Sequence, residues 1–187
     1  EHRDLHLSIR RQRQMCIRDR KRNASIWPTS NNSAELLCSS IDRSKVKNIL
    51  ELGPGTWPVT KYIIQSSQNW ADYYGIEYDI DFISLLENRF PAQRGQFLQG
   101  NVKDLTAIMS KNSIPTPDLI ISTLPNSVFE QYPHLVGELA VFLEQWTVFR
   151  AITYAPDLFI DVYQHIHPKV LGHTWKNIPP LYVLWVN

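Results

Sequence analysis

Two acidic residues and a pair of glycines in the first half of the chain have the types and the spacing of a small-molecule site. Glu51 stands two residues before Gly53 in the run Glu51-Leu-Gly-Pro-Gly-Thr56. Because a glycine has no Cβ, Gly53 and Gly55 can adopt positive φ and let a ligand lie against the backbone. A helix beginning near Thr56 would point its free N–H groups at that ligand. Glu77 follows Gly55 by 22 residues, at the spacing of a carboxylate that accepts ribose hydroxyls.

The charge of these residues narrows the class of ligand. A dinucleotide fingerprint requires a third Gly or Ala where this chain has Pro58, which disfavours a nicotinamide cofactor. The carboxylate of Glu51 would repel a phosphate but suits a ligand that carries an ammonium and a sulfonium. S-adenosylmethionine has that charge pattern and also a ribose. We therefore expect it to be the cofactor, bound by Glu51, Gly53, Gly55, Thr56 and Glu77.

The acidic residues near Glu77 have an alternative, local interpretation. Glu77, Asp79 and Asp81 precede a helix that we expect over residues 82–89, and acidic residues stabilise the positive end of a helix. We favour this interpretation for Asp79 and Asp81. For Glu77 we favour the ribose contact.

Apolar runs around these residues predict strands that alternate with helices, the pattern of a parallel sheet. The run Val46–Leu52 is rich in Val, Ile and Leu, as expected for a strand buried on both faces. Only Asn177-Ile-Pro-Pro180 separates the last two strands, which is too short for a helical crossover, so that pair should be antiparallel. The predicted fold is α/β, a three-layer, doubly wound, mostly parallel seven-stranded sheet of Rossmann-like type with an antiparallel C-terminal strand pair. We expect strands over 46–52, 73–77, 96–98, 119–122, 148–154, 170–176 and 181–186, and helices over 33–41, 59–66, 82–89, 105–110, 127–144 and 156–164.

The charge of the chain is unevenly distributed. Its 187 residues suit one domain, and the net charge is +1. Residues 1–22 carry +5, whereas residues 23–187 carry −4. Part of the basic segment, Arg11–Arg20, resembles a translated sequencing adapter, so we expect residues 1–22 to be foreign to the protein and residues 23–187 to form the domain. The alternative is a basic arm that contacts a membrane surface.

Composition also bears on location and metals. No apolar stretch approaches the ~20 residues that cross a bilayer, so we expect no transmembrane segment. Cys16 and Cys38 lack metal-ligand spacing, and we find no secretory signal. We expect a cytoplasmic protein without a metal ion; His165 and His167 are interpreted as solvent-facing. The oligomeric state is left open.

Further motifs resemble a known family. They are Ser25-Ile-Trp-Pro-Thr-Ser30, Gly75-Ile-Glu-Tyr-Asp79, Phe90-Pro91, Gly100-Asn101, Ser122-Thr-Leu-Pro125 and Trp175-Lys-Asn-Ile-Pro-Pro180. With Glu51–Thr56 they resemble the soluble bacterial phospholipid N-methyltransferases, which are class I methyltransferases related to the ribosomal RNA adenine dimethylases. The resemblance runs from about Ala24 to the C-terminus and implies the fold given above.

The resemblance adds residues to the cofactor site and identifies two departures from the family pattern. It implies that Tyr78 and Asn101 contact the cofactor, with Asn101 receiving the adenine amino group where the family has Asp. An amide oxygen can accept the same hydrogen bond. Asp104 is instead expected to cap the next helix. Trp57 stands where the family has a small residue, so it either crowds the methionine end of the cofactor or turns away.

The acceptor site is expected at the carboxyl ends of the strands, where the chain carries Ser122-Thr-Leu-Pro125. In the adenine-methylating relatives this loop reads Asn-Leu-Pro-Tyr, and its aromatic residue stacks on the base. Here Ser122 replaces the amide and Asn126 replaces the aromatic residue. We therefore predict methylation of a phospholipid head-group amine, of the phosphatidylethanolamine type, at a membrane surface, with Ser122 and Pro125 in the catalytic site. The alternative for Ser122 is to cap a turn.

Transfer to an amine also requires loss of a proton, because an alkylammonium has a pKa of about 10. Tyr154, at the end of the fifth predicted strand, is the residue expected to accept this proton and to face the methylated cation. Trp175 is either a second aromatic face or a residue of the sheet. An RNA adenine methyltransferase would show an aromatic platform and a basic surface, so nucleic acid is disfavoured as a partner. A domain that binds without catalysis, blocked by Trp57, is the other alternative.

Overall fold

A seven-stranded sheet forms the centre of the computed structural model, which describes residues 31–39, 41–56, 58–67, 70–93, 95–162, 164–174 and 180–186. The strand order is β3-β2-β1-β4-β5-β7-β6. The strands are β1 (Asn48–Leu52), β2 (Asp72–Glu77), β3 (Phe97–Gln99), β4 (Leu119–Ser122), β5 (Val148–Thr153), β6 (Lys169–Thr174) and β7 (Leu181–Val186).

Pairing within the sheet confirms the predicted doubly wound fold. Strands β1 to β5 pair in parallel, whereas β7 is antiparallel to both β5 and β6. The antiparallel C-terminal pair was predicted from the short connection, but its placement, with β7 between β5 and β6, was not.

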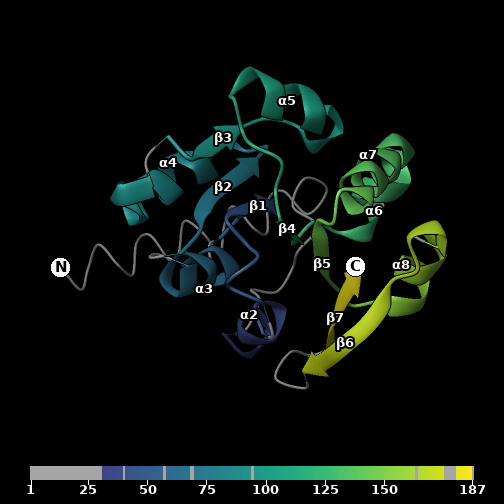
Figure 1. Ribbon diagram of the computed structural model, residues 1–187. Coiled ribbons are helices and arrows are strands. Elements are labelled where there is room, and N and C mark those ends of the chain that lie inside the picture. The colour runs from purple at the N-terminus through teal and green to yellow at the C-terminus, as the bar shows by residue number, and fades with distance from the viewer. Residues whose placement is uncertain are drawn as a thin grey trace.

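Helices cover both faces of the sheet, which makes three layers (Figure 1). One face packs on α2 (Asn31–Leu37), α3 (Pro58–Ser67) and α4 (Ile80–Arg89), and the other on α5 (Leu105–Lys111), α6 (Asn126–Gln131), α7 (Pro133–Glu144) and α8 (Pro156–Val162). A hydrophobic core lies on each face of the sheet, and alternate residues of the central strands pack into one or the other. Ile49 and Ile121 face the first set of helices, and Leu50 and Ile120 face the second. Short 3₁₀ turns η1 (Pro91–Gln93), η2 (Val102–Asp104) and η3 (Gln164–Ile166) complete the described elements.

One predicted helix was wrong. The expected helix over 127–144 is two helices, since α6 ends at Gln131 and α7 begins at Pro133. Proline has no N–H and restricts the residue before it, so Tyr132 adopts φ −125° and ψ 71° and separates the two helices. The break allows α6 to start directly at the carboxyl end of β4.

The ends of two other elements show which residues act as caps. Asp79 caps α4, because its side chain accepts a hydrogen bond from the N–H of Asp81, as predicted. Asp104 does precede α5, but its side chain makes no capping bond there, so that part of the prediction was wrong. The capping side chain is Asn101, which accepts from the N–H of Lys103 at the start of η2.

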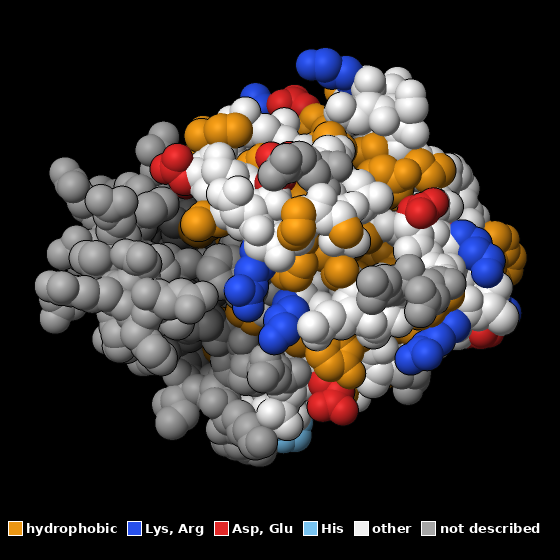
Figure 2. All heavy atoms as spheres, turned by 90° about the vertical axis from the view of Figure 1, so that its left-hand side faces the viewer, with side chains coloured by type: hydrophobic (Ala, Val, Ile, Leu, Met, Phe, Trp, Pro, Cys, Tyr) orange, Lys and Arg blue, Asp and Glu red, His pale blue; other side chains and the backbone are white. Residues whose placement is uncertain are grey.

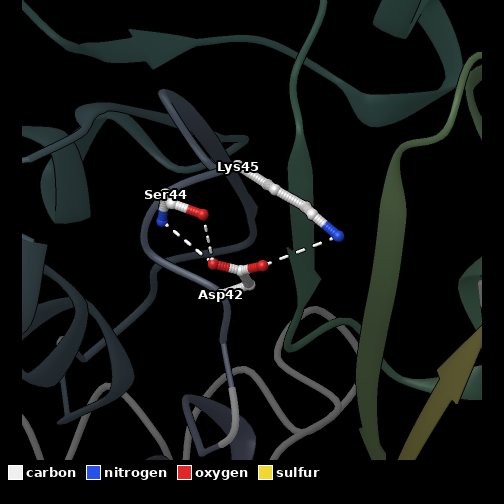
Figure 3. Close-up of polar contacts among 3 residues, drawn as sticks. All are labelled: Asp42, Ser44 and Lys45. Carbon is white, nitrogen blue, oxygen red and sulfur yellow. Dashed lines mark hydrogen bonds and ion pairs between the residues drawn. The ribbon is translucent and has the colours of Figure 1, made fainter.

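The chain enters β1 through a polar turn (Figure 3). Asp42 accepts hydrogen bonds from the backbone N–H of Ser44 (3.1 Å) and from its hydroxyl (2.6 Å), and it pairs with Lys45 at 3.6 Å. The bonds from Ser44 lower the pKa of Asp42. This turn lies before the amino-terminal end of β1, opposite the edge at which the predicted site residues lie.

The surface in Figure 2 mixes side-chain types. In the part of this face that the structure describes, Lys and Arg side chains alternate with acidic and hydrophobic ones. Within the described ranges, no helix has the length and apolar character to cross a membrane. Residues 1–22, the motif 25–30, Trp57, Trp175 and Asn177 lie outside the described residues.

Candidate functional site

The loop after β1 adopts the conformation for which its glycines are needed. Gly53 has φ +76° and Gly55 has φ +53°, both in the left-handed region that favours glycine. The N–H of Gly53 donates to the carbonyl of Ile76 in β2, at 2.9 Å. A Cβ at Gly53 would lie 2.7 Å from Cδ2 of Leu124, so the loop packs directly against the loop that follows β4. Thr56 lies half-buried at the end of the turn, just before α3.

Glu77, the last residue of β2, is bonded to this loop. Its Oε2 accepts from the N–H of Gly55 at 2.9 Å, and its Oε1 accepts from the N–H of Asp79 at 3.0 Å. Burial raises the pKa of Glu77, while the backbone hydrogen bonds oppose that shift. An ionised carboxylate has about four acceptor positions, so Glu77 keeps acceptor capacity for a further donor such as a ribose hydroxyl.

Glu51 lies beneath the loop rather than at its surface. It is 0% exposed, and its Oε2 accepts a hydrogen bond from the hydroxyl of Tyr73 at 2.7 Å. Its other oxygen, Oε1, is buried without a hydrogen-bond partner. Among the described residues, no Lys or Arg forms an ion pair with this carboxyl. Burial raises the pKa of Glu51 to about 7, an effect that the Tyr73 hydrogen bond partly offsets.

A glycine makes the contact between Tyr73 and Glu51 possible. Gly75 pairs with Glu51 across β1 and β2, and Tyr73 lies two residues earlier on the same face of β2. A Cβ at Gly75 would lie 2.7 Å from the Tyr73 hydroxyl and 2.9 Å from Cγ of Pro54. The absence of a side chain therefore leaves room both for the tyrosine and for the cofactor loop.

Tyr78 and Asn101 lie at the ends of neighbouring strands. Tyr78 follows Glu77 and is 60% exposed, an open aromatic face beside the loop. The N–H of Gly100 donates to the carbonyl of Glu77 at 2.9 Å, which places Asn101 beside the end of β2. The amide oxygen of Asn101 already accepts from Lys103 at 3.1 Å and keeps one further lone pair.

The loop after β4 is tied to the glycine loop by a residue that the sequence interpretation missed. The N–H of Thr123 donates to the carbonyl of Leu52 at 3.1 Å, and its hydroxyl donates to the carbonyl of Gly53. The sequence did contain a signal for this contact, because Thr123 is a hydroxyl residue directly after a buried strand. Through Thr123 and Leu124, the predicted acceptor loop and the predicted cofactor loop form one unit.

The predicted acceptor residues occupy different surroundings. Ser122 is fully buried at the end of β4, and its hydroxyl accepts from the N–H of Leu124 at 3.3 Å, the turn-capping contact that was the alternative interpretation. Pro125 precedes α6, and its carbonyl accepts from the N–H of Val128 at 3.0 Å. Tyr154 follows β5 and is half-buried.

The structure therefore brings the predicted residues to one edge of the sheet. Hydrogen bonds join Glu77 to Gly55 and, through Thr123, Gly53 to the loop that holds Ser122 and Pro125. Glu51 lies behind this edge, in contact with Tyr73, which the sequence interpretation also missed. Within the described residues, no group of three His, Cys, Asp or Glu side chains is arranged to hold a metal ion.

The residues present fit a cationic cofactor. A buried carboxyl with one unpartnered oxygen, Glu51, matches a ligand that brings its own positive charge, because an unpaired buried carboxylate is costly. Glu77 retains acceptor positions next to a loop whose backbone is open to close approach. Trp57 lies outside the described residues, so whether it turns away from the cofactor stays a prediction.

Comparison with known proteins gives one curated relative and many similar folds. No model of a protein family matches the chain. The chain is 30% identical over 162 residues to an ornithine lipid N-methyltransferase of Singulisphaera acidiphila, covering 84% of each sequence. Among solved structures, it resembles a precorrin-6y C5,15-methyltransferase from Geobacter metallireducens, with a TM-score of 0.65 and 10% identity over 86% of this chain and 89% of that one.

A further structural neighbour was solved with its cofactor. The O-methyltransferase TomG of Streptomyces achromogenes, in complex with S-adenosylmethionine, has a TM-score of 0.59 and 12% identity, and the match covers 86% of this chain and 82% of that one. At these identities the structural neighbours show the fold alone.

Proposed function

Since this chain belongs to the class I S-adenosylmethionine-dependent methyltransferases, and among them to the family of the ornithine lipid N-methyltransferase, we propose that it methylates the primary amine of a lipid head group. The structural observation that carries the proposal is the joined pair of loops at the carboxyl edge of the sheet. One loop is bonded to Glu77 and the other leads into α6, and Thr123 connects the two.

The first loop supports the cofactor half of the proposal. When bound, S-adenosylmethionine supplies a methyl group activated by a sulfonium. Glu77 would accept the ribose hydroxyls while it holds Gly55, and Tyr78 and Asn101 would contact the adenine. Gly53, Gly55 and Thr56 would present backbone to the ligand. Glu51 would balance the positive charge from beneath the loop, since no cation of the described residues pairs with it.

The second loop supports the acceptor half. A lipid amine is protonated at neutral pH and must lose a proton before its nitrogen can form a bond to the methyl carbon. The hydroxyl of Tyr154 would relay this proton, accepting it while its own phenolic proton passes to water, and its ring would stabilise the more methylated cation. Pro125 would orient the amine through the main chain at the start of α6. The hydroxyl of Ser122 is buried and bonded to Leu124, so within this proposal it acts by shaping the loop.

Two lipids are the candidate acceptors. The curated relative is named for ornithine lipid, and the sequence motifs favour phosphatidylethanolamine; both carry a primary amine on a flexible aliphatic chain. A flexible amine needs an acceptor for its N–H and a wall to orient it, but no base-stacking platform. Asn126 in place of an aromatic residue suits such an acceptor better than adenine.

A lipid acceptor would require the protein to work at a membrane surface. We infer peripheral contact with the cytoplasmic face of the membrane. If residues 1–22 belong to the protein, their charge of +5 would add attraction to anionic lipids. The charge of −4 on residues 23–187 favours a lipid over RNA as the partner.

The acceptor class can be tested by following a radiolabelled methyl group. The full-length protein is incubated with labelled S-adenosylmethionine and, in parallel, with vesicles of phosphatidylethanolamine, vesicles of ornithine lipid, vesicles of phosphatidylglycerol and ribosomal RNA. The proposal predicts label in at least one of the two aminolipids and none in phosphatidylglycerol, which has no amine. Label in RNA alone would show an adenine methyltransferase instead. Label nowhere, with a folded protein, would favour a domain without catalysis.

A further inference from the structure

Asn126 joins the loops that follow β4 and β5. Its Nδ2 donates to the carbonyl of Ala155 at 3.4 Å, and its Oδ1 accepts from the hydroxyl of Thr153 at 3.2 Å. The same hydroxyl oxygen accepts from the N–H of Ala155 at 3.0 Å. Two of these hydrogen bonds tether the residues on both sides of Tyr154 to Asn126, the first residue of α6, and the third joins those two residues to each other.

Both ends of this connection are anchored in regular elements. Thr153 is the last residue of β5 and is buried, and Asn126 opens α6 directly after Pro125. Asn126 and Ala155 are half-buried, so the bonds form partly shielded from bulk water, where hydrogen bonds are electrostatically stronger. Side-chain hydrogen bonds, in addition to the strand pairing of the sheet, therefore hold the backbone at Tyr154 in place relative to the acceptor loop.

Resting on the function proposed above, we propose that Asn126 is a positioning residue for methyl transfer, which acts through Thr153 and Ala155 to fix Tyr154 opposite the acceptor loop. Asn126 does not itself need to touch the lipid. Its amide offers a donor and an acceptor at once, and the connection uses both. A carboxylate at this position would accept from Thr153 but would face the carbonyl of Ala155 without a proton to donate.

Substitutions at both ends of the connection test this role. The full-length variants Asn126→Ala, Asn126→Asp, Thr153→Val and Thr153→Ser are compared in methyl transfer to aminolipid vesicles, with cofactor affinity measured separately by calorimetry. Gln131→Ala, an exposed position at the end of α6, is the matched control. Thr153→Ser keeps the hydroxyl but loses the methyl group. It should retain kcat if the hydrogen bond matters, whereas a role in packing alone predicts a loss of kcat.

We expect a loss of kcat without a loss of cofactor binding. A misplacement of about 1 Å can cost about a hundredfold, so Asn126→Ala, Asn126→Asp and Thr153→Val should lower kcat roughly ten- to hundredfold and change the cofactor Kd less than about twofold. The double variant Asn126→Ala/Thr153→Val should lose less kcat than the product of the two single effects, because both single variants remove the bond between Asn126 and Thr153.

The results that overturn the proposal are distinct from those that overturn the function. An active wild-type enzyme whose Asn126→Ala variant keeps the wild-type kcat and lipid KM contradicts the positioning role alone. The same holds if Thr153→Ser loses as much kcat as Thr153→Val. If Asn126→Ala does not fold, the comparison of kcat between Thr153→Ser and Thr153→Val tests the positioning role. A wild-type protein that binds cofactor but methylates no aminolipid contradicts the proposed function, and the positioning role falls with it.

Discussion

The carboxylate of Glu77 accepts a hydrogen bond from the N–H of Gly55 at 2.9 Å, so the end of β2 holds the loop that leaves β1. The two residues are 22 positions apart in the sequence but adjacent at the carboxyl edge of the sheet. The acid that would bind the ribose therefore also shapes the loop that would bind the rest of the cofactor.

Replacing this acid should weaken cofactor binding strongly. Hydrogen bonds to a charged group contribute about 1.5–3 kcal/mol, so Glu77→Ala should raise the Kd for S-adenosylmethionine about ten- to hundredfold. Glu77→Gln should have a smaller effect, because one acceptor oxygen remains. Calorimetry provides the measurement, and Glu144→Ala, an exposed acid at the end of α7, is the control. Equal affinities for wild type and Glu77→Ala would exclude the assigned role.

The buried pair of Tyr73 and Glu51 should contribute to stability. Tyr73→Phe removes the donor from a fully buried carboxyl, which should lower the free energy of unfolding by about 1–3 kcal/mol. Tyr74→Phe, on the same strand but the opposite face, is the matched control and should have little effect. Urea unfolding followed by circular dichroism measures both. A loss in Tyr74→Phe as large as in Tyr73→Phe would refute the importance of the Glu51 contact.

Gly75 should be coupled energetically to Tyr73. An added Cβ would meet the Tyr73 hydroxyl at 2.7 Å, so Gly75→Ala should be destabilising, and less so when Tyr73 is already Phe. Part of the cost should persist, because Pro54 also lies 2.9 Å from that position. Unfolding of the two single variants and the double variant gives the coupling. Free energies that add within about 0.5 kcal/mol would show that the two positions are independent.

Stability should depend on pH through Glu51. Its pKa is raised from 4.5 to about 7, so the folded state binds the proton more tightly than the unfolded state. The resulting stabilisation is fully present below pH 4.5 and is lost as pH rises through about 7, a change of about 3 kcal/mol. Glu51→Gln should remove this dependence. The measurement is the free energy of unfolding of the wild type and of Glu51→Gln, plotted against pH across this range. If the two plots of unfolding free energy against pH stay parallel, Glu51 does not cause the pH dependence.

Cofactor affinity should show the opposite trend with pH. A positively charged ligand favours the ionised form of Glu51, so affinity for S-adenosylmethionine should rise as pH increases through about 7. Calorimetry in buffers of different ionisation enthalpy should detect proton release on binding near and below this pH. Release that is unchanged in Glu51→Gln would assign the proton to another group.

Much of the fold was predictable because its signals are local. Buried central strands such as β1 are continuous apolar runs, and the short link before Leu181 allows only an antiparallel partner. The division of the helix at Pro133 was also present in the sequence, since a proline rarely lies within a helix. The position of β7 within the sheet depends on long-range pairing, which no local pattern records.

The site was predictable in outline but not in its supporting contacts. The glycines and Glu77 carry their signal in residue type and spacing. The contact of Tyr73 with Glu51 depends on the register that pairs Glu51 with Gly75, and the role of Asn126 depends on the meeting of two loops 27 residues apart. Ser122 was predicted to lie in the acceptor site because it ends a strand, yet β4 is buried along its whole length and the Ser122 hydroxyl caps the turn at Leu124.

Direct titration of S-adenosylmethionine into the full-length protein, followed by calorimetry, tests the central claim that this edge of the sheet binds the cofactor. We expect saturable binding at one site per chain, weakened by Glu77→Ala and stronger above pH 7 than below it. A folded protein that shows no binding heat at any of several temperatures, and no change in thermal unfolding with added cofactor, would contradict it.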